Sequence, residues 1–269
     1  MPDSISFDTF HLLMSALIGL FAGLVGGLLG VGGSTIIIPG LTLLLGPSQH
    51  LYQAAAMIAN VAVSIPAALR HLRAKAVVAS VLKWMLPVTL GSVVFGVWIS
   101  NLEIFRGTSG GLWLGRILAV FLIYEAVSNF QKLIRHREEP ETTPLITPAR
   151  SSVVGFFMGT VGGMLGIGGG AMAVPLQHML LKLPLRQAIA NSATVMVFSA
   201  ALGSIFKTAT LGLHHISWTQ GLVLAGILAP SCFLGGWIGA GLTHRIPTRW
   251  VRMVFVVILL ASSWKMLAL

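Results

Sequence analysis

The chain of 269 residues is 55% hydrophobic and only 9% charged, whereas roughly a quarter of the residues are charged in soluble domains. This composition excludes an ordinary soluble fold. The formal net charge of +10 would suggest a nucleic-acid partner in a soluble protein, but here the Lys and Arg residues lie in short loops between apolar runs, so we expect them to set membrane topology and expect no nucleic-acid partner.

Cysteine and histidine usage argues against a cofactor. Cys232 is the single cysteine and lies within an apolar run. One cysteine excludes an intrachain disulfide and a thiolate metal cluster. The eight His residues show no pair with the context of a metal site. We therefore expect neither a metal nor any other cofactor.

Apolar runs along the chain predict an all-α polytopic membrane protein. The uncharged stretches 10–69 and 151–181 exceed the ~20 residues that an α-helix needs to cross the hydrocarbon layer. The first ten residues contain no Lys or Arg, unlike a cleaved signal peptide, so we expect the first apolar segment to remain in the protein. The expected helical segments are 10–29, 34–46, 51–72, 78–100, 114–134, 151–167, 170–182, 186–211, 217–243 and 249–268. The second and seventh are too short to span alone.

The chain contains an internal repeat. Residues 19–33 align without a gap on residues 155–169, and seven glycines coincide. Self-similarity of this kind indicates two related halves of about five helical segments each. We expect a first transmembrane repeat over residues 1–135, a solvated linker over 136–150, and a second transmembrane repeat over 151–269.

Basic residues orient the two halves, because short loops rich in Lys and Arg stay in the cytoplasm. If each glycine cluster forms a hairpin, the linker is cytoplasmic, both chain ends face outward, and the halves have opposite orientation. This arrangement leaves four of the 17 Lys and Arg residues outside, whereas parallel halves would leave seven. We therefore predict inverted repeats, a plan common among secondary transporters. The four outer residues would be Arg106, Arg116, Lys207 and Lys265.

Two glycine clusters, GGLLGVGGS at 26–34 and GGMLGIGGG at 162–170, contain too many glycines for an uninterrupted helix. We expect each helix to break inside the membrane, where irregular backbone is buried in protein or lines a wet cavity. The half-helices that follow would begin with free N–H groups, which favour an anion. Close helix packing by small residues is the alternative interpretation. The free N–H groups are expected at Gly33, Ser34, Gly169 and Gly170.

The glycine clusters thus predict a substrate site made by backbone and not by side-chain charge. The candidate residues are Gly30, Gly32, Gly33, Ser34, Gly166, Gly168, Gly169 and Gly170. A side chain at Gly33 or Gly169 would push the anion away from N–H groups, so Gly33→Val and Gly169→Val should suppress transport and leave folding largely intact. Substitutions at Gly107 and Gly110, which look like loop glycines, should be tolerated.

Polar side chains within apolar segments 51–72 and 186–211 would complete the anion's hydrogen bonds. The candidates are Asn60, Asn191, Ser192 and Thr194, and the repeat aligns the first of these with the last. Ser199 lies in the same segment as the last three. Interhelical hydrogen bonds worth ~1 kcal/mol are an equally good explanation for any one of them.

Glu125 is the single acidic residue inside a predicted span, and a carboxylate there is a candidate for proton or cation coupling. Its aligned position in the second half is Ala261, which places Glu125 outside the repeated core. A structural hydrogen bond to another helix is therefore an equally good explanation.

The two glycine clusters, the prolines that follow them at Pro39 and Pro175, and the Gln-Ala segments at Gln53 and Gln187 together resemble the TauE/SafE family of sulfite exporters. The resemblance covers essentially the whole chain. It implies a multi-pass permease of the plasma membrane for sulfite, sulfoacetate or other organosulfur anions. Ser34 stands where the second half has Gly170, which suggests that the halves contribute unequally to the site.

These observations predict a secondary transporter that moves a small anion, such as a sulfur oxyanion or an organosulfonate, by alternating access across the plasma membrane. A passive anion channel is one alternative. An intramembrane hydrolase is another, with Ser34 as the candidate nucleophile, although no catalytic partner is evident and we expect no enzyme activity. The lipid bilayer is the expected environment, and a homo-oligomer is compatible with the sequence.

Overall fold

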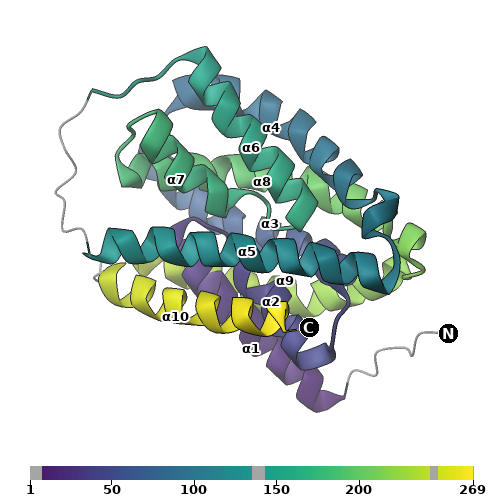
Figure 1. The fold of residues 1–269 in the computed structure, drawn as a ribbon. Helices are drawn as coiled ribbons and strands as arrows, with labels where there is room; N and C mark the ends of the chain where they lie inside the picture. Colours follow the sequence, from purple (N-terminus) through teal and green to yellow (C-terminus); the bar gives the residue numbers. More distant parts are fainter. Residues whose placement is uncertain (1–7, 135–142, 243–247, 269) are drawn as a thin grey trace.

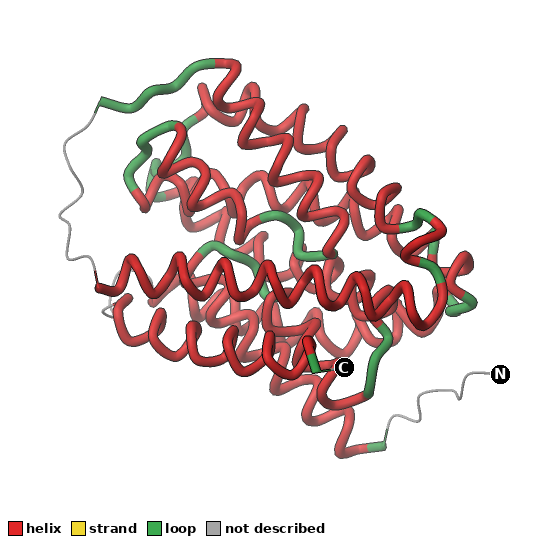
Figure 2. The backbone as a smooth tube through the Cα atoms, viewed as in Figure 1, coloured by secondary structure: helices red, strands yellow, loops and turns green. Residues whose placement is uncertain are grey.

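A computed structural model describes residues 8–134, 143–242 and 248–268 (Figure 1). Every regular element in these ranges is helical, and the backbone tube in Figure 2 shows no strand there. The all-α prediction and the expected helical segments are confirmed. The helices are α1 (Thr9–Leu29), α2 (Ser34–Leu45), α3 (Gln49–Arg73), α4 (Ala79–Ser100), α5 (Gly107–Ile134), α6 (Pro148–Leu165), α7 (Gly170–Leu180), α8 (Leu185–Ala209), α9 (Trp218–Leu242) and α10 (Thr248–Leu267), with 3₁₀ turns at η1 (Glu103–Phe105) and η2 (Leu211–His214).

Within the described residues, six helices are long and apolar enough to cross a membrane, namely α1, α3, α4, α5, α8 and α9. The chain is a multi-pass membrane protein, as predicted. The short helices α2 and α7 contain 12 and 11 residues. At ~1.5 Å per residue they reach roughly 18 Å, well short of the ~30 Å hydrocarbon layer. The second helix of each half therefore cannot span alone.

Glycine ends both α1 and α6. Gly30 and Gly166 follow these helices in the left-handed backbone conformation, with φ of 69° and 71°. Each donates its N–H to a carbonyl four residues earlier, at Gly26 or Gly162, and so closes the last turn. Glycine adopts this conformation without the steric cost that a Cβ brings. Residues 30–33 form the first glycine break and residues 166–169 the second, as predicted.

Other glycines of the clusters serve close packing. A Cβ on Gly27 would lie 2.6 Å from the carbonyl oxygen of Gly236 in α9, and a Cβ on Gly163 would overlap the carbonyl oxygen of Val93 in α4. Small residues thus let α1 approach α9 and let α6 approach α4. The predicted helix breaks and the close packing both occur, but at different glycines, because those within the helices pack and those after them end the helix.

The two halves pack on each other reciprocally. The first helix of each half packs on the fourth helix of the other, while α3 packs on α8 and α5 on α10. Gln53 near the start of α3 meets Lys207 near the end of α8, and Met57 lies against Gly203 one turn further along α3. These equivalent helices therefore run antiparallel. Such a course supports inverted repeats, although the inversion across a membrane remains a prediction.

Helix α5 begins at Gly107, before the predicted residue 114. The glycine-rich stretch 107–111 resembles a loop in sequence but forms the first turns of this helix. A Cβ on Gly110 would overlap the backbone of Phe105. The prediction that substitutions at Gly110 are tolerated is therefore wrong. Gly107 has no atom within 4 Å of such a Cβ, but its φ of 70° still favours glycine.

The segment between the halves is only partly described. Residues 136–142 of the predicted linker lie outside the described residues. Thr147 Oγ1 accepts a hydrogen bond of 3.3 Å from the N–H of Arg150 and caps α6, so residues 148–150 belong to the helix. The end of α5 lies at the left of Figure 1 and α6 begins at the top, whereas α1 begins at the lower right. The end of α5 and the amino end of α1 thus lie at opposite ends of the bundle.

Candidate functional site

Asn60 of α3 joins the two glycine breaks. Its Oδ1 accepts hydrogen bonds from the N–H groups of Gly33, at 2.8 Å, and Ser34, at 3.2 Å. Its Nδ2 donates to Ser34 Oγ and, at 3.1 Å, to the carbonyl oxygen of Ile167 in the second break. The Asn60 side chain is fully buried. One amide therefore binds the start of α2 and the second break at the same time.

These hydrogen bonds correct one prediction. The N–H groups of Gly33 and Ser34 are not free, because the amide oxygen of Asn60 occupies them. A neutral acceptor thus stands where the sequence predicts an anion. For Gly169 and Gly170, free N–H groups remain a prediction.

The surroundings of the glycines correct a second prediction, namely that a side chain at Gly33 would push an anion away from the N–H groups. A Cβ on Gly33 would lie 3.2 Å from Ile37 Cδ1, and its three nearest atoms belong to Ile37 and Ala22 and not to Asn60. A Cβ on Gly32 would lie 3.1 Å from Asn60 Oδ1. A Cβ on Gly168 in the second break would lie 2.9 Å from Asn60 Nδ2. Gly32 and Gly168 therefore leave the space that Asn60 fills, and Gly33 does not.

The other glycines of the breaks are enclosed by protein. A Cβ on Gly30 would lie 2.6 Å from Ile189 Cγ2, and one on Gly170 would lie 2.8 Å from the carbonyl oxygen of Val31. A Cβ on Gly169 would overlap the carbonyl oxygen of Met158, and its φ of 81° is unfavourable for any side chain. We therefore expect Gly169→Val to disrupt the fold, contrary to the prediction that it leaves folding intact.

Serine hydroxyls of α8 bind the backbone at both breaks. Ser192 Oγ donates to the carbonyl oxygen of Gly30 in the first break, at 3.1 Å, or to that of Gly170 at the start of α7, at 3.3 Å. Ser199 Oγ donates to the carbonyl oxygen of Gly168 at 3.2 Å. Ser192 and Ser199 are seven residues apart and so share one face of the helix. This spacing is a signal in the sequence that would have added Ser199 to the candidate set.

Two predicted site residues make their hydrogen bonds elsewhere. Asn191 Oδ1 accepts from the N–H of Val78 at 2.8 Å, and its Nδ2 donates to Gln177 Oε1 at 3.0 Å. Asn191 thus ties α8 to the turn before α4 and to α7. Thr194 Oγ1 donates to the carbonyl oxygen of Ala190 within its own helix, at 2.8 Å. Neither side chain hydrogen-bonds to a glycine break in the described structure.

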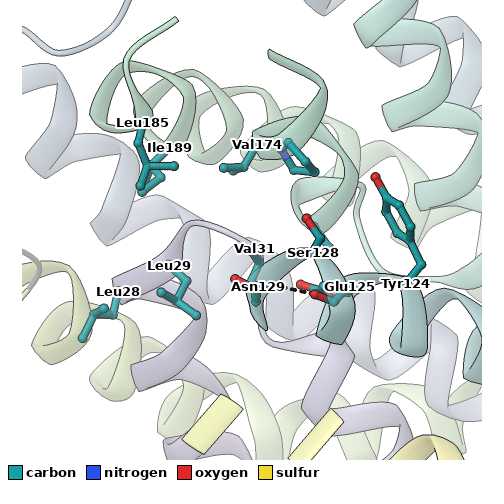
Figure 3. A pocket seen from close by; sticks show the side chains of 12 residues that line it. Leu28, Leu29, Val31, Tyr124, Glu125, Ser128, Asn129, Val174, Leu185 and Ile189 are labelled. Atoms are coloured by element: carbon teal, nitrogen blue, oxygen red, sulfur yellow. Dashed lines mark hydrogen bonds between the residues drawn. The ribbon is translucent and has the colours of Figure 1, made fainter. Parts of the chain in front are cut away.

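Glu125 lies next to the first glycine break. It is 3% exposed and projects from α5 into a cavity of about 40 Å³ (Figure 3). The residues that end α1, Leu28 and Leu29, line this cavity together with residues of α7 and α8. Asn129 Nδ2 donates to the backbone carbonyl of Glu125 at 2.9 Å. The sequence alignment places Glu125 outside the repeated core, but the fold brings it to that core. A volume of this size holds about one water molecule.

Comparison with known proteins identifies relatives. A sequence profile of the family described as sulfite exporter TauE/SafE matches residues 15–266. The chain is 28% identical, over 97% of its length, to the probable membrane transporter protein MamO of Magnetospirillum gryphiswaldense and covers 45% of that protein. It is 27% identical, over 90% of its length, to the probable membrane transporter protein YunE of Bacillus subtilis, of which it covers 92%.

A third relative is a probable membrane transporter protein of Haemophilus influenzae, 26% identical over 95% of this chain and 97% of that protein. The chain spans less than half the length of the MamO proteins that it matches. The family profile covers most of the chain and includes both glycine breaks. The chain therefore belongs to the sulfite exporter TauE/SafE family.

Proposed function

We propose that this protein is a secondary transporter that moves a small anion, such as sulfite or an organosulfonate, across the plasma membrane by alternating access. The family is described as sulfite exporters, and the relatives above are named probable membrane transporters. The two glycine breaks, buried between α3 and α8, form the proposed site. The breaks present backbone N–H groups, together with neutral amide and hydroxyl groups, to a bound anion.

The observation that carries the proposal is the position of the Asn60 amide. Its oxygen accepts from two successive N–H groups at the start of α2, where the helix dipole favours negative charge. An oxygen atom of a small oxyanion would make the same two hydrogen bonds. Asn60 would then turn its Nδ2 toward the anion and complete the shell. In this proposal the Asn60 amide holds the site closed until the anion replaces its oxygen.

Burial of the site supports alternating access. Asn60, Ser34 and Ser192 are each fully buried, and the adjoining cavity has room for about one water molecule. An anion therefore reaches the breaks only after α3 and α8 move relative to the short helices. Equivalent helices that cross antiparallel support two equivalent movements, one toward each side of the membrane.

The substitutions Asn60→Asp and Asn60→Ala test this proposal. The carboxylate of Asn60→Asp would bind the N–H groups of Gly33 and Ser34 as a built-in anion, so we expect sulfite uptake into proteoliposomes to fall about 100-fold or more. Asn60→Ala should reduce uptake less, because it leaves the N–H groups to the substrate. Ser263→Ala, whose hydroxyl bonds to Leu260 within α10, is the control.

Three results would contradict the proposal. Equal sulfite uptake by Asn60→Asp and Ser263→Ala would show that the anion does not bind at the Asn60 position. Single-channel currents through the wild-type protein would show that it is a pore and not a carrier. A wild-type protein that neither transports nor exchanges any anion of a panel of sulfite, sulfate, sulfoacetate and carboxylates would exclude anion transport.

A further inference from the structure

A buried cation lies at the end of α8. Lys207 is 2% exposed, and its Nζ donates to Gln53 Oε1 of α3 and, at 2.8 Å, to Ser100 Oγ of α4. No carboxylate pairs with Lys207 in the described ranges 8–134, 143–242 and 248–268. A charged amine inside a membrane protein is costly, and it is retained where it pairs with another group or serves function. Its neutral partners leave the positive charge uncompensated.

Two hydrogen-bond donors without acceptors lie on the α3 helix that contacts Lys207. Gln53 Nε2 is buried and has no hydrogen-bond partner among the described residues, and the same holds for Gln49 Nε2 one turn earlier on α3. Buried polar groups are normally paired. The Lys207 amine and the two amide groups could all donate to a negatively charged acceptor, and the described residues supply none to them. This combination fits a small oxyanion.

The cation adjoins the second glycine break through Gln53. A Cβ on Gly166 would lie 2.5 Å from Gln53 Cβ, so the Gln53 side chain runs from the break to Lys207. The Gly166 position is therefore one side chain away from the positive charge. An anion held at Lys207 would lie beside the proposed site without entering it.

A pocket lies on the other side of the cluster. It has a volume of about 440 Å³ and is lined by Gln49, His50, His214 and His215 among others. The rings of His50 and His214 stack at 3.4 Å between centroids, and His214 Nε2 lies 2.8 Å from Asn101 Oδ1. Burial, together with the Lys207 charge, lowers the pKa of His214 to about 4. His214 is thus neutral at physiological pH and adds no positive charge to the cluster.

We propose that Lys207, with the Gln53 amide and the Ser100 hydroxyl, forms a second anion site through which the substrate passes between this pocket and the glycine breaks. The inference rests on the proposed anion transport. At this site the anion is held by charge and is then released to the uncharged breaks, where only backbone and neutral groups hold it. A merely structural Lys207, joining α3, α4 and α8, is the competing explanation.

Two substitutions test the site with sulfite as the probe. Lys207→Met keeps the length of the side chain and removes the charge. Gln53→Glu keeps the shape of the amide and pairs Lys207 with an internal carboxylate. We expect each to raise the KM of sulfite uptake about tenfold or more, with a smaller change in maximal rate, because hydrogen bonds to charged groups are among the stronger ones. Lys207→Arg keeps the charge and should stay closer to the wild type.

Folding and binding are measured on the same proteins. Stabilisation of detergent-solubilised protein by sulfite in a thermal-shift titration should be lost in both variants. The melting temperature without sulfite should hold or rise in Lys207→Met, because an apolar side chain replaces a buried charge. Lys83→Met, which removes an exposed lysine of α4, is the matched control and should behave as the wild type.

The outcomes separate this inference from the proposed function. If the wild type transports sulfite and both variants keep its KM and its thermal shift, the Lys207 site is wrong and the proposed function stands. If sulfite stabilises the wild type through Lys207 but is not transported, the anion site stands and the proposed function is wrong. A fall in melting temperature with unchanged sulfite affinity would assign Lys207 a structural role.

Discussion

The two glycine breaks have nearly the same sequence, but their backbones differ at Gly33, with φ of −87°, and Gly169, with φ of 81°, and different hydrogen bonds surround them. At the first break an acceptor, Asn60 Oδ1, binds N–H groups at the start of α2. At the second break the described contacts are donors to carbonyl oxygens, Ser199 Oγ to Gly168 and Asn60 Nδ2 to Ile167, while the Ser192 hydroxyl lies between the carbonyls of Gly30 in the first break and Gly170. The repeated glycines end α1 and α6 in the same way, whereas the unrepeated side chains differ between the breaks. In the proposed function the anion therefore binds at the first break.

The largest expected effect separates backbone requirements at the two breaks. Gly169→Val should prevent correct folding, because φ is 81° and a Cβ would overlap Met158 O, and we expect a loss of more than about 4 kcal/mol. Gly33→Ala is the change to compare in the first break, where φ is −87°. There the Cβ meets only the flexible side chain of Ile37 and ordinary contacts. It should cost within about 1 kcal/mol. Monodispersity and melting temperature of both proteins in detergent measure the difference.

A folded, monodisperse Gly169→Val protein would contradict the enclosure of the second break. An unfolded Gly33→Ala protein would show that the first break is as tightly enclosed as the second.

Much of the structure around the two breaks is predictable from the sequence. The hydrogen-bond partners are not, and the reason is physical. Glycine clusters and apolar runs are local signals, and they predict the helices, both breaks and the importance of Asn60. Hydrogen-bond partners distant in the chain are not local. The sequence therefore gives no sign that Asn60 fills the N–H groups of Gly33 or that Asn191 turns toward Gln177.

Burial of single residues is equally hard to foresee. Lys207 lies near a helix end and resembles an outer topology signal in the sequence, yet it is buried against Gln53. Glu125 has no counterpart in the repeat, yet it lines the cavity beside the first break. Gly110 looks like a loop glycine, yet it packs on η1. Each error concerns packing between segments far apart in the chain.

A second prediction uses Glu125, the buried carboxylate that lines the cavity beside the first break. If Glu125 carries the coupling proton, Glu125→Gln should abolish sulfite accumulation driven by a pH gradient and spare sulfite exchange across proteoliposomes without a gradient. Glu103→Gln, which alters an exposed carboxylate of η1, is the control. Equal pH dependence of uptake in wild type and Glu125→Gln would assign Glu125 a structural role at this break.

The smallest expected effect concerns the serines of α8. Ser192→Ala removes a donor shared by the carbonyls of Gly30 and Gly170, and Ser199→Ala removes the donor to Gly168. A hydrogen bond of this kind contributes roughly 1 kcal/mol, which corresponds to a fall in melting temperature of about 2–4 °C for each variant. Ser192→Ala should lie at the upper end, because its hydroxyl serves both breaks.

The changes in melting temperature and in the KM of sulfite uptake show whether these hydroxyls bind the backbone or the substrate. As backbone donors, both serines should affect melting temperature without changing the KM of sulfite uptake, since their acceptors are carbonyl oxygens and not an anion. Ser231→Ala provides the baseline, because its hydroxyl bonds to Leu228 within α9. A raised KM with an unchanged melting temperature would place the anion at the second break as well. Both breaks would then bind the substrate. They would differ only in the side of the anion that each one contacts.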